Sequence, residues 1–440
     1  MKHTHPLFAL VSLASVSTSS AATAVWSSTG TAGANWSDAA NWGGTAPVNG
    51  DDIEIGIPVA GGARITTNDS LTSVNSLWLK ANLNEANGNA LTLNGNSVRF
   101  TAGGTSVGRI GLNLDLTQNT NYEVSANTGT GRLEVSGNIA GAFALNKTGD
   151  GRLRLVGTAK TYSGDTNVTA GMLDVSSDNM LPFGTGKGNV NIGVGATFFL
   201  NNVNTQINGL NDYNSTTGTI SKAGNNTRNL TLGNGDANGS FSGAITFTGG
   251  SSTIHKVGAG TQVLSGNVST VGTGTVSGGA LLINGTWNTG LTANSGGTIG
   301  GTGTISGAVT VNAGGKLAPG ASIESLGVGS ANIAGTLVTE YDGTGSGTID
   351  LLSVTGLLDI ANATVDFNMF GTALDDASYI FASYGSLNGA AFANVVDLPS
   401  GYEINYAFGG NNIALVAVPE PAAALLGTIG ALALLRRRRN

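Results

Sequence analysis

Apolar residues alternate with small polar residues along most of this chain. Val, Ile, Leu and Phe recur at every second position with Thr, Ser, Asn or Gly between them, as in Leu153-x-Leu155 and Leu173-x-Val175. A period of two is typical of strands that bury one face, and no long helical period occurs between the two chain ends. The pattern predicts many short strands and an all-β protein.

Glycine separates these strands. The chain has 70 glycines among 440 residues, and Asn-Gly steps such as Asn94-Gly95 and Asn284-Gly285 stand between apolar pairs. Both residues accept backbone conformations that other residues avoid, so these steps favour sharp turns. Only 10% of the residues are charged. Because apolar residues recur throughout, the composition is that of a packed chain rather than a disordered one.

One motif occurs twice. The pattern Leu-x-Lys-x-Gly-x-Gly-x-Leu-x-Leu-x-Gly occupies residues 145–157, and it recurs 109 residues later at 254–266 with Gln262 in place of Leu153. A following Val-x-x-Gly-x-Leu pattern at 168–173 recurs at 276–281. Such a strand-turn-strand unit cannot bury its apolar face alone, so copies must stack. The repeat predicts a right-handed parallel β-helix, or β-solenoid, with glycines at the corners.

These two segments resemble the passenger-associated, autotransporter-type strand-loop-strand repeat. The glycine-rich block at residues 296–320 and the segment from Trp36 to Trp42 resemble further motifs of the same family. The resemblance covers most of the chain from Trp26 to Pro421 and is thinner between Ile57 and Ala142. It implies an exported, non-enzymatic protein with a structural or adhesive function.

The C-terminal segment has three parts. Val418-Pro419-Glu420-Pro421 precedes an apolar run from Ala422 to Leu435, and the chain ends with four arginines and Asn440. The prolines stop an upstream strand, the apolar run enters a bilayer, and the arginines stay on the cytoplasmic side. Fourteen helical residues rise only about 21 Å against about 30 Å of hydrocarbon. The pattern predicts a short hydrophobic helix that anchors temporarily; an ordinary C-terminal helix with a solvated basic tail is the alternative.

This order of parts resembles the PEP-CTERM sorting signal, on which an exosortase of Gram-negative bacteria acts. The resemblance implies a transient inner-membrane anchor, followed by location at the cell surface, in the outer membrane or in an extracellular matrix. It also implies exopolysaccharide or cell-surface glycans as partners. The residues that the resemblance assigns to sorting and processing are Val418, Pro419, Glu420 and Pro421, and those that it assigns to orientation in the membrane are Arg436, Arg437, Arg438 and Arg439.

The N-terminus has the order of a secretory signal peptide. Lys2 is followed by a modest apolar stretch from Pro6 to Val16, and Ala22-Thr23-Ala24 offers an Ala-x-Ala cleavage site. The segment predicts export by the Sec machinery with cleavage set by Ala22 and Ala24. A Ser- and Ala-rich terminus without that function is the alternative.

Aromatic residues mark the start of the mature chain. Trp26, Trp36 and Trp42 predict a packed cap on the first coil, and stacking of exposed rings on sugars is the alternative. The sequence therefore divides into a signal peptide (1–24), a cap (25–58), a solenoid body (59–326), an acidic C-terminal β region (327–417) and the sorting signal (418–440).

The net charge and the absence of cysteine exclude some classes of partner and of stabilising bond. Asp and Glu number 26 against 19 Lys and Arg, a formal net charge of −7, which argues against nucleic acid as a partner. From Leu317 to Pro421 there is no Lys or Arg. This acidity favours solubility, with loose recruitment of divalent cations as the alternative. The chain has no cysteine, which excludes disulfides and thiolate metal sites.

Groups suited to catalysis are few. His255 is the one histidine beyond residue 5, and we interpret it as a solvent-facing strand residue, around which any Ser-His-Asp triad would have to be built. With no second His and no Cys to complete the ligand set, a zinc site is not supported. The acidic candidates are Asp51, Asp52 and Glu54, and Asp375 with its neighbour Asp376; among them only Asp52 and Glu54 share one face of a strand. We predict no catalytic residue, metal ligand or cofactor. A polysaccharide-active β-helix lyase or hydrolase, or a glycan-binding protein, remains the alternative.

Overall fold

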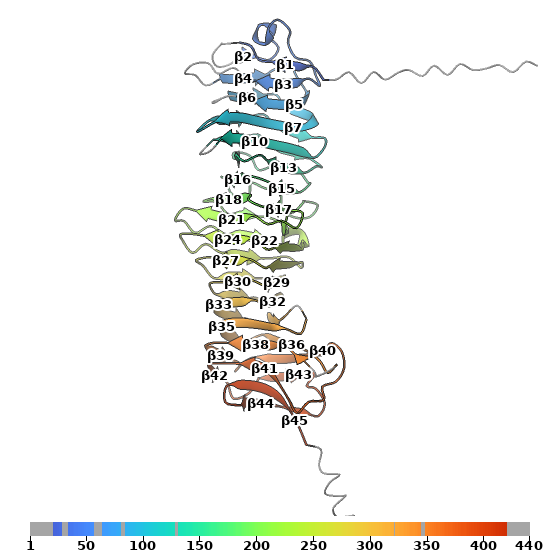
Figure 1. Cartoon of the computed structure of the whole chain (residues 1–440), viewed down its shortest axis with the longest axis vertical. Coiled ribbons are helices and arrows are strands. Elements are labelled where there is room, and N and C mark those ends of the chain that lie inside the picture. The colour runs from blue at the N-terminus through green and yellow to red at the C-terminus, as the bar shows by residue number, and fades with distance from the viewer. Residues whose placement is uncertain are drawn as a thin grey trace, which may run out of the picture.

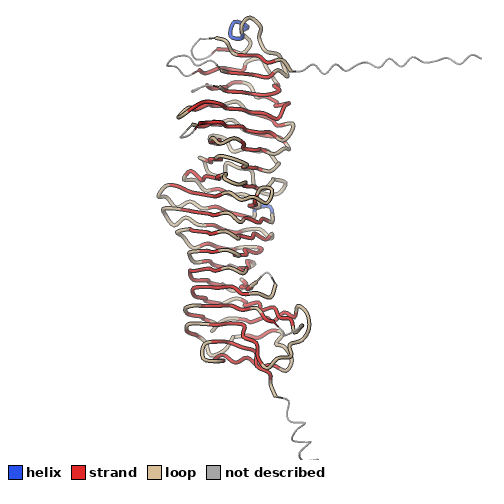
Figure 2. Tube along the Cα trace, in the orientation of Figure 1, coloured by secondary structure: helices blue, strands red, loops and turns tan. Residues whose placement is uncertain are grey.

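The computed structural model describes residues 21–28, 34–56, 64–80, 84–127, 131–320, 322–344 and 348–419. Most of the predicted signal peptide and the predicted C-terminal helix lie outside these ranges. Within them the chain is all-β apart from two short 3-10 helices, η1 (Ala39–Trp42) and η2 (Asn234–Asp236). The strands wind into one long rod of stacked coils (Figures 1 and 2). The predicted parallel β-solenoid is confirmed.

The first ladder of parallel strands forms one side of the rod. Each strand pairs with the strand one coil further on, as Asn146 pairs with Asn167. The ladder is one sheet from β1 to β20, and a second sheet from β23 to β43 continues the same side. Its strands are β1 (Thr23–Val25), β3 (Asp52–Ile55), β5 (Ser73–Leu79), β7 (Leu91–Gly103), β10 (Thr120–Asn127), β13 (Leu145–Thr148), β15 (Thr166–Val168), β17 (Val190–Ile192), β20 (Leu210–Asp212), β23 (Gly239–Phe241), β26 (Thr261–Leu264), β29 (Gly279–Ile283), β32 (Gly297–Gly301), β34 (Lys316–Pro319), β36 (Thr336–Asp342), β40 (Thr364–Met369) and β43 (Asn394–Val396).

The second ladder forms the next side around the coil. Its strands also pair in parallel with the corresponding strand of the neighbouring coil. They are β2 (Ala34–Asn35), β4 (Arg64–Asn68), β6 (Asn84–Gly88), β8 (Val107–Ile110), β11 (Arg132–Val135), β14 (Arg152–Leu155), β16 (Met172–Val175), β18 (Thr197–Asn201), β21 (Thr219–Ala223), β24 (Ala244–Phe247), β27 (Asn267–Ser269), β30 (Thr286–Trp287), β33 (Thr304–Val311), β35 (Ser325–Ile333), β38 (Leu351–Val354) and β41 (Ser378–Ser383).

A third, less regular ladder completes a three-sided coil. The long strands β5, β7, β33 and β35 turn a corner, so each belongs to two ladders. Consecutive coils advance by 17 to 32 residues, and the extra residues lie in the connections between strands. The remaining strands of this side are β9 (Leu114–Leu116), β12 (Ile139–Gly141), β19 (Thr205–Gln206), β22 (Leu230–Leu232), β25 (Ile254–Lys256), β28 (Gly274–Val276), β31 (Leu291–Ala293), β39 (Leu357–Asp359) and β42 (Ser386–Asn388).

The core is a column of apolar side chains between the three sides. Alternate residues of each strand point inward and stack on their counterparts in the adjacent coils, as Leu153 stacks between Leu133 and Leu173. All three are fully buried. Burial of each such side chain stabilises the fold by about 1.5 to 3 kcal/mol. The alternation seen in the sequence is therefore this inward and outward period of the strands.

Both ends of the rod are covered. At the N-terminal end Trp26 and Trp36 each meet Trp42 edge to face, with ring centroids 4.9 and 6.0 Å apart. At the C-terminal end, β45 (Asn412–Ala417) runs antiparallel to β41 and to β44 (Tyr402–Phe408), and β37 (Thr348–Ile349) runs antiparallel to β36. Antiparallel strands break the coil repeat and leave less of the ladder edge unpaired. The coils themselves continue through the expected boundary at Leu326, inside β35.

The duplicated motif builds a corner of the coil rather than a whole coil. In the first copy it joins β13 to β14, which lie in the first and second ladders. In the second copy it joins β25 to β26, which lie in the third and first ladders. The equivalent glycines Gly149 and Gly258 have positive φ angles of 72° and 68°. The two copies therefore have one local structure at two different corners of the three-sided coil.

Gln262 is polar where the first copy of the motif has the apolar Leu153, and its contacts explain this difference. The side chain is fully buried, and its Nε2 donates to the carbonyl of Leu210 (2.9 Å) while its Oε1 accepts from the N–H of the same residue (3.1 Å). Leu210 lies two coils away, at the end of the first sheet. Between them stands Gly239, where a Cβ would come within 2.2 Å of Oε1. The first ladder is interrupted between β20 and β23. The side-chain amide of Gln262 there supplies the hydrogen bonds that the backbone of Leu210 would otherwise make to a neighbouring strand.

We expect Gln262→Leu to destabilise the protein although it restores the residue found in the first copy. Leucine leaves the N–H and the carbonyl of Leu210 buried without partners, at about 1 to 3 kcal/mol for each group. Thermal unfolding followed by circular dichroism should show a melting temperature several degrees lower. Gln206→Leu, at a half-buried position of β19, is the control and should change it little. An unchanged or raised melting temperature for Gln262→Leu would contradict this role.

Candidate functional site

The acidic residues considered for catalysis have structural partners. Asp52 accepts hydrogen bonds from Asn75 Nδ2 (2.7 Å) and Ser76 Oγ (2.6 Å) in the adjacent coil. Glu54 forms an ion pair with Lys80 at 2.5 Å. The two carboxylates do share one face of β3, as predicted, but each is held by the next coil.

The other candidates lie far from this pair. Asp375 and Asp376 lie near the C-terminal end, where their backbone N–H groups both donate to the hydroxyl of Tyr379. His255 lies mid-rod on β25, with Nδ1 2.7 Å from Thr275 Oγ1, and partial burial lowers its pKa. In the described part of the chain, no three His, Asp or Glu side chains gather as a metal site would require.

The three N-terminal tryptophans are core residues. Trp26 and Trp36 are fully buried, and Trp42 Nε1 donates to the carbonyl of Trp36 (2.9 Å). The expected packing of these three rings is confirmed, and the alternative of sugar stacking on them is wrong because none of the three is exposed.

The predicted processing residues lie at the two ends of the described chain. The carbonyl of Ala22 accepts from the N–H of Asp52 (2.8 Å), and Ala24 pairs with Ile53 within β1. At the other end the N–H of Val418 donates to Gly401 (2.8 Å), and Val418 and Pro419 are exposed. The remaining ones, Glu420, Pro421 and Arg436 to Arg439, fall outside the described residues. Across the ranges that the structure describes, none of the helices has the length and apolarity to cross a bilayer.

A ladder of asparagine side chains runs along the outer surface of the first side. Asn146 donates to Asn121 (3.0 Å), Asn167 to Asn146 (2.8 Å), Asn191 to Asn167 (2.7 Å) and Asn211 to Asn191 (3.1 Å). The N–H of Ser240 then donates to Asn211 Oδ1 (2.9 Å). The sequence analysis missed this ladder, because the coils between its members differ in length.

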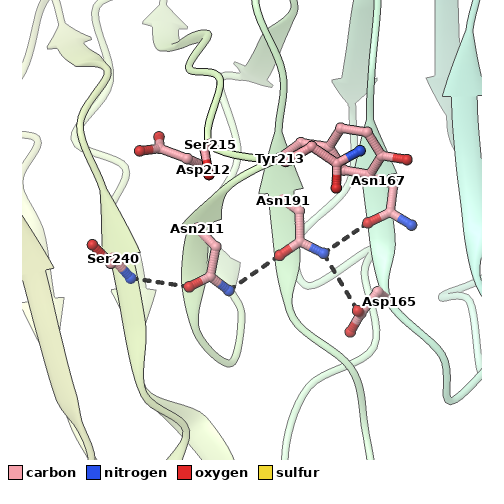
Figure 3. A pocket seen from close by; sticks show the side chains of 9 residues that line it. Asp165, Asn167, Asn191, Asn211, Asp212, Tyr213, Ser215 and Ser240 are labelled. Atoms are coloured by element: carbon pink, nitrogen blue, oxygen red, sulfur yellow. Dashed lines mark hydrogen bonds between the residues drawn. The ribbon is translucent and has the colours of Figure 1, made fainter.

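The ladder forms the floor of a surface hollow of about 700 Å³, which we call the amide hollow. Figure 3 shows its hydrogen bonds from Ser240 through Asn211 and Asn191 to Asn167, with Asp165 bonded to Asn191. Its remaining lining comes from the end of β20 and the turn that follows. The residues that line it are Asp165, Asn167, Asn191, Asn211, Asp212, Tyr213, Asn214, Ser215 and Ser240.

The second side carries a cluster of opposite charges instead. Glu134 on β11 pairs with Arg132 (2.7 Å), Arg109 (3.1 Å) and Arg154 (3.5 Å). Burial alone would raise the pKa of Glu134, but the hydrogen bonds from Arg132 and Arg109 lower it below its usual value. Asp174, one coil beyond Arg154, has Oδ2 3.5 Å from Arg154 Nε. These charges neutralise each other across the coils, so this surface is held by its own ion pairs.

Comparison with known proteins bears directly on the corner motif. The family model described as "Passenger-associated-transport-repeat" matches residues 145–175 and 254–283. These are the two segments that build the equivalent corners. The chain carries autotransporter-type passenger repeats.

A curated relative shares more of the chain. The protein named "Adhesin BmaC autotransporter" from Brucella suis biovar 1 (strain 1330) is 32% identical over 197 residues, which are 44% of this chain. The chain covers 5% of the length of that protein. The similarity is therefore to a small part of a much longer adhesin.

The lysine of each passenger repeat has a structural role at the corner. Lys147 Nζ donates to the carbonyls of Thr148 (2.7 Å), Gly149 (2.6 Å) and Ala170 (3.0 Å). Lys256 makes the equivalent three contacts at 2.6 to 3.2 Å in the second copy. Burial lowers the pKa of Lys147 to about 7. A lysine with such a pKa could serve as a base, but this one is fully buried and its three donors are engaged.

We expect Lys147→Met to lower the melting temperature, because methionine leaves three corner carbonyls without a donor. The pH dependence should also change. The folded-state pKa is about 7 against an ordinary 10.5, so between these values the unfolded chain binds a proton that the folded chain releases. Wild-type stability should therefore gain up to about 1.4 kcal/mol per pH unit from this group as pH rises from about 7 to 10.

Melting temperatures measured at pH 7, 8 and 9 test this directly. The wild type should gain stability over that range relative to Lys147→Met. Lys316→Met removes an exposed lysine of β34 and should leave the wild-type pH dependence intact. If the curves of Lys147→Met and the wild type run parallel, the lysine does not titrate as its burial requires.

Proposed function

We propose that this protein is exported from a Gram-negative bacterium and serves at the cell surface, or in the extracellular matrix, as a structural and adhesive rod. The Sec machinery would export it, and an exosortase would recognise the tail that begins at Val418. The tail would hold the chain in the inner membrane until Pro419, Glu420 and Pro421 are processed. The proposed partners are the exosortase and glycans of the surface or of an exopolysaccharide.

The observation that carries this proposal is the long stack of coils that contains two passenger repeats. A solenoid gives length and rigidity without a globular catalytic centre, and its outward residues form long polar surfaces suited to many weak contacts. The relative in Brucella suis that shares 197 residues is named an adhesin. At the C-terminal end, the last strand ends at Ala417, and Val418 and Pro419, the first two residues of the proposed recognition motif, are exposed.

The distribution of reactive groups favours this function over polysaccharide cleavage. A glycosidase needs two carboxyl groups at a defined separation across one substrate bond. Here Asp52 and Glu54 lie near the N-terminal end, and Asp375 and Asp376 lie near the C-terminal end, with the intervening coils between them. Each of the first two is engaged by a neighbouring coil. We therefore propose a non-enzymatic protein.

A double variant, Pro419→Ala with Glu420→Ala, should remain in the inner membrane. The substitutions remove the predicted recognition residues but leave the apolar run and arginines that would hold the chain. Fractionation of the native host followed by intact mass spectrometry should find the wild type at the surface without its arginine tail. The double variant should keep the tail and stay with the inner membrane.

Glu403→Ala is the matched control, because Glu403 is an exposed acidic residue on β44 outside the tail. It should be processed and released like the wild type. Normal release of the double variant, or a surface-located wild type that still carries Arg436 to Arg439, would refute sorting by this tail.

A further inference from the structure

We propose that the amide hollow binds a neutral glycan chain, laid along the rod axis over Asn167, Asn191 and Asn211 with one sugar ring against Tyr213. The inference specifies a ligand for the proposed surface function and rests on that function only for its biological setting. The binding itself is a property of the solenoid, so it can be tested apart from sorting.

The ladder leaves hydrogen-bonding capacity for a ligand. Each asparagine amide has two N–H donors and an oxygen with two lone pairs. The ladder uses one donor of Asn167 and one of Asn211, together with one lone pair on each oxygen. Within the described chain, the second N–H of each of these amides has no protein acceptor. Sugar hydroxyls, which both donate and accept, match an amide that presents a donor beside an acceptor.

The charge of the hollow selects against other ligand classes. Asp165 accepts from Asn189 N–H (2.8 Å) and Asp212 from Ser242 Oγ (2.7 Å), so both carboxylates are fixed at the rim. No Lys or Arg belongs to the lining. Anionic chains such as polyuronates would meet two fixed carboxylates and no cation, and an apolar ligand would find one aromatic ring among amides and hydroxyls. An uncharged, hydroxyl-rich ligand is the class that fits.

The spacing of the ladder suits a polymer. Adjacent coils in a parallel ladder lie about 4.8 Å apart, close to the length of one pyranose unit in an extended chain. Asn167 and Asn211, two coils apart, therefore each present a free N–H to the ligand, and Asn191 between them presents the remaining lone pair of its oxygen. The volume of about 700 Å³ falls within the range of small-ligand sites, roughly 300 to 1,000 Å³.

The turn after β20 is built to hold Tyr213 in place. Asn214 and Ser215 both have positive φ angles, 49° and 59°, which cost energy for residues other than glycine. The turn is closed by the N–H of Thr216, which donates to the carbonyl of Tyr213 (3.0 Å), and by the Thr216 hydroxyl (2.7 Å). Such strain persists where the surroundings impose it. Here it keeps an aromatic ring at the wall of the hollow, where a ring face can stack on a sugar.

Isothermal titration calorimetry on the protein isolated from its host tests the proposal. The probes are hexasaccharides of β-1,4-linked glucose, β-1,4-linked mannose and α-1,4-linked glucose, with hexagalacturonate as the anionic counterpart. We expect at least one neutral probe to bind, and hexagalacturonate to bind at least about tenfold more weakly. Tyr213→Ala should lower the affinity for the neutral probe about tenfold or more.

Two matched variants separate binding from folding. Tyr213→Phe keeps the ring and should keep binding within about threefold of the wild type. Asn121→Ala shortens the ladder at its far end without touching the lining, and should leave the affinity within about twofold. Circular dichroism and melting curves show whether each variant retains the solenoid.

Three outcomes would overturn the inference: no neutral probe binds, hexagalacturonate binds as tightly as the neutral chains, or Asn121→Ala weakens binding as much as Tyr213→Ala. None of these outcomes would test the proposed processing of the C-terminal tail. Conversely, a chain that binds the neutral probe in solution but stays in the inner membrane would refute the sorting proposal and leave the glycan site standing.

Discussion

Pairing of each coil with the next is the interaction on which the whole molecule depends. A single coil has mostly short strands, from two residues (β2) to 13 (β7), and no partner of its own, so the N–H and C=O groups of these strands are satisfied by the adjacent coils. The apolar column inside the rod depends on the same stacking, since Leu153 is covered by Leu133 and Leu173. Any device that keeps adjacent coils at one spacing therefore stabilises both the ladder and the core.

The corners are where that spacing is hardest to keep. A corner turns carbonyl groups away from the ladder, and a buried carbonyl without a donor costs about 1 to 3 kcal/mol. Lys147 and Lys256 supply donors to three carbonyls each, two within the corner and one in the adjacent coil. The contact to the adjacent coil ties one corner to the next. The Lys and Gly that the two copies of the repeat share are thus explained together, because the glycine turns the chain and the lysine donates to the carbonyls that the turn leaves without a ladder partner.

Much of this fold could be predicted from local patterns, and the rest depends on how coils align. Alternation predicted the strands, and the two copies of the motif predicted stacking. The asparagine ladder was invisible because its members are 25, 21, 24 and 20 residues apart, so no fixed period links them. The role of Gln262 was hidden for the same reason, since its partner Leu210 is 52 residues away. Because the connections between strands differ in length, residues that lie side by side in adjacent coils are not regularly spaced in the sequence.

Inward and outward positions therefore follow different constraints. Inside, and at the corners, each residue is fixed by close contact with the coil above and below, as the approach of Gly239 to Gln262 shows. Outside, a residue needs only to lie beside its counterpart, so one side can carry amides while the next carries the ion pairs of Glu134. A rigid frame with free outer positions holds a row of identical groups in register without dedicated loops. Such a row suits the proposed polymeric ligand, because consecutive coils are spaced at about the length of one sugar unit.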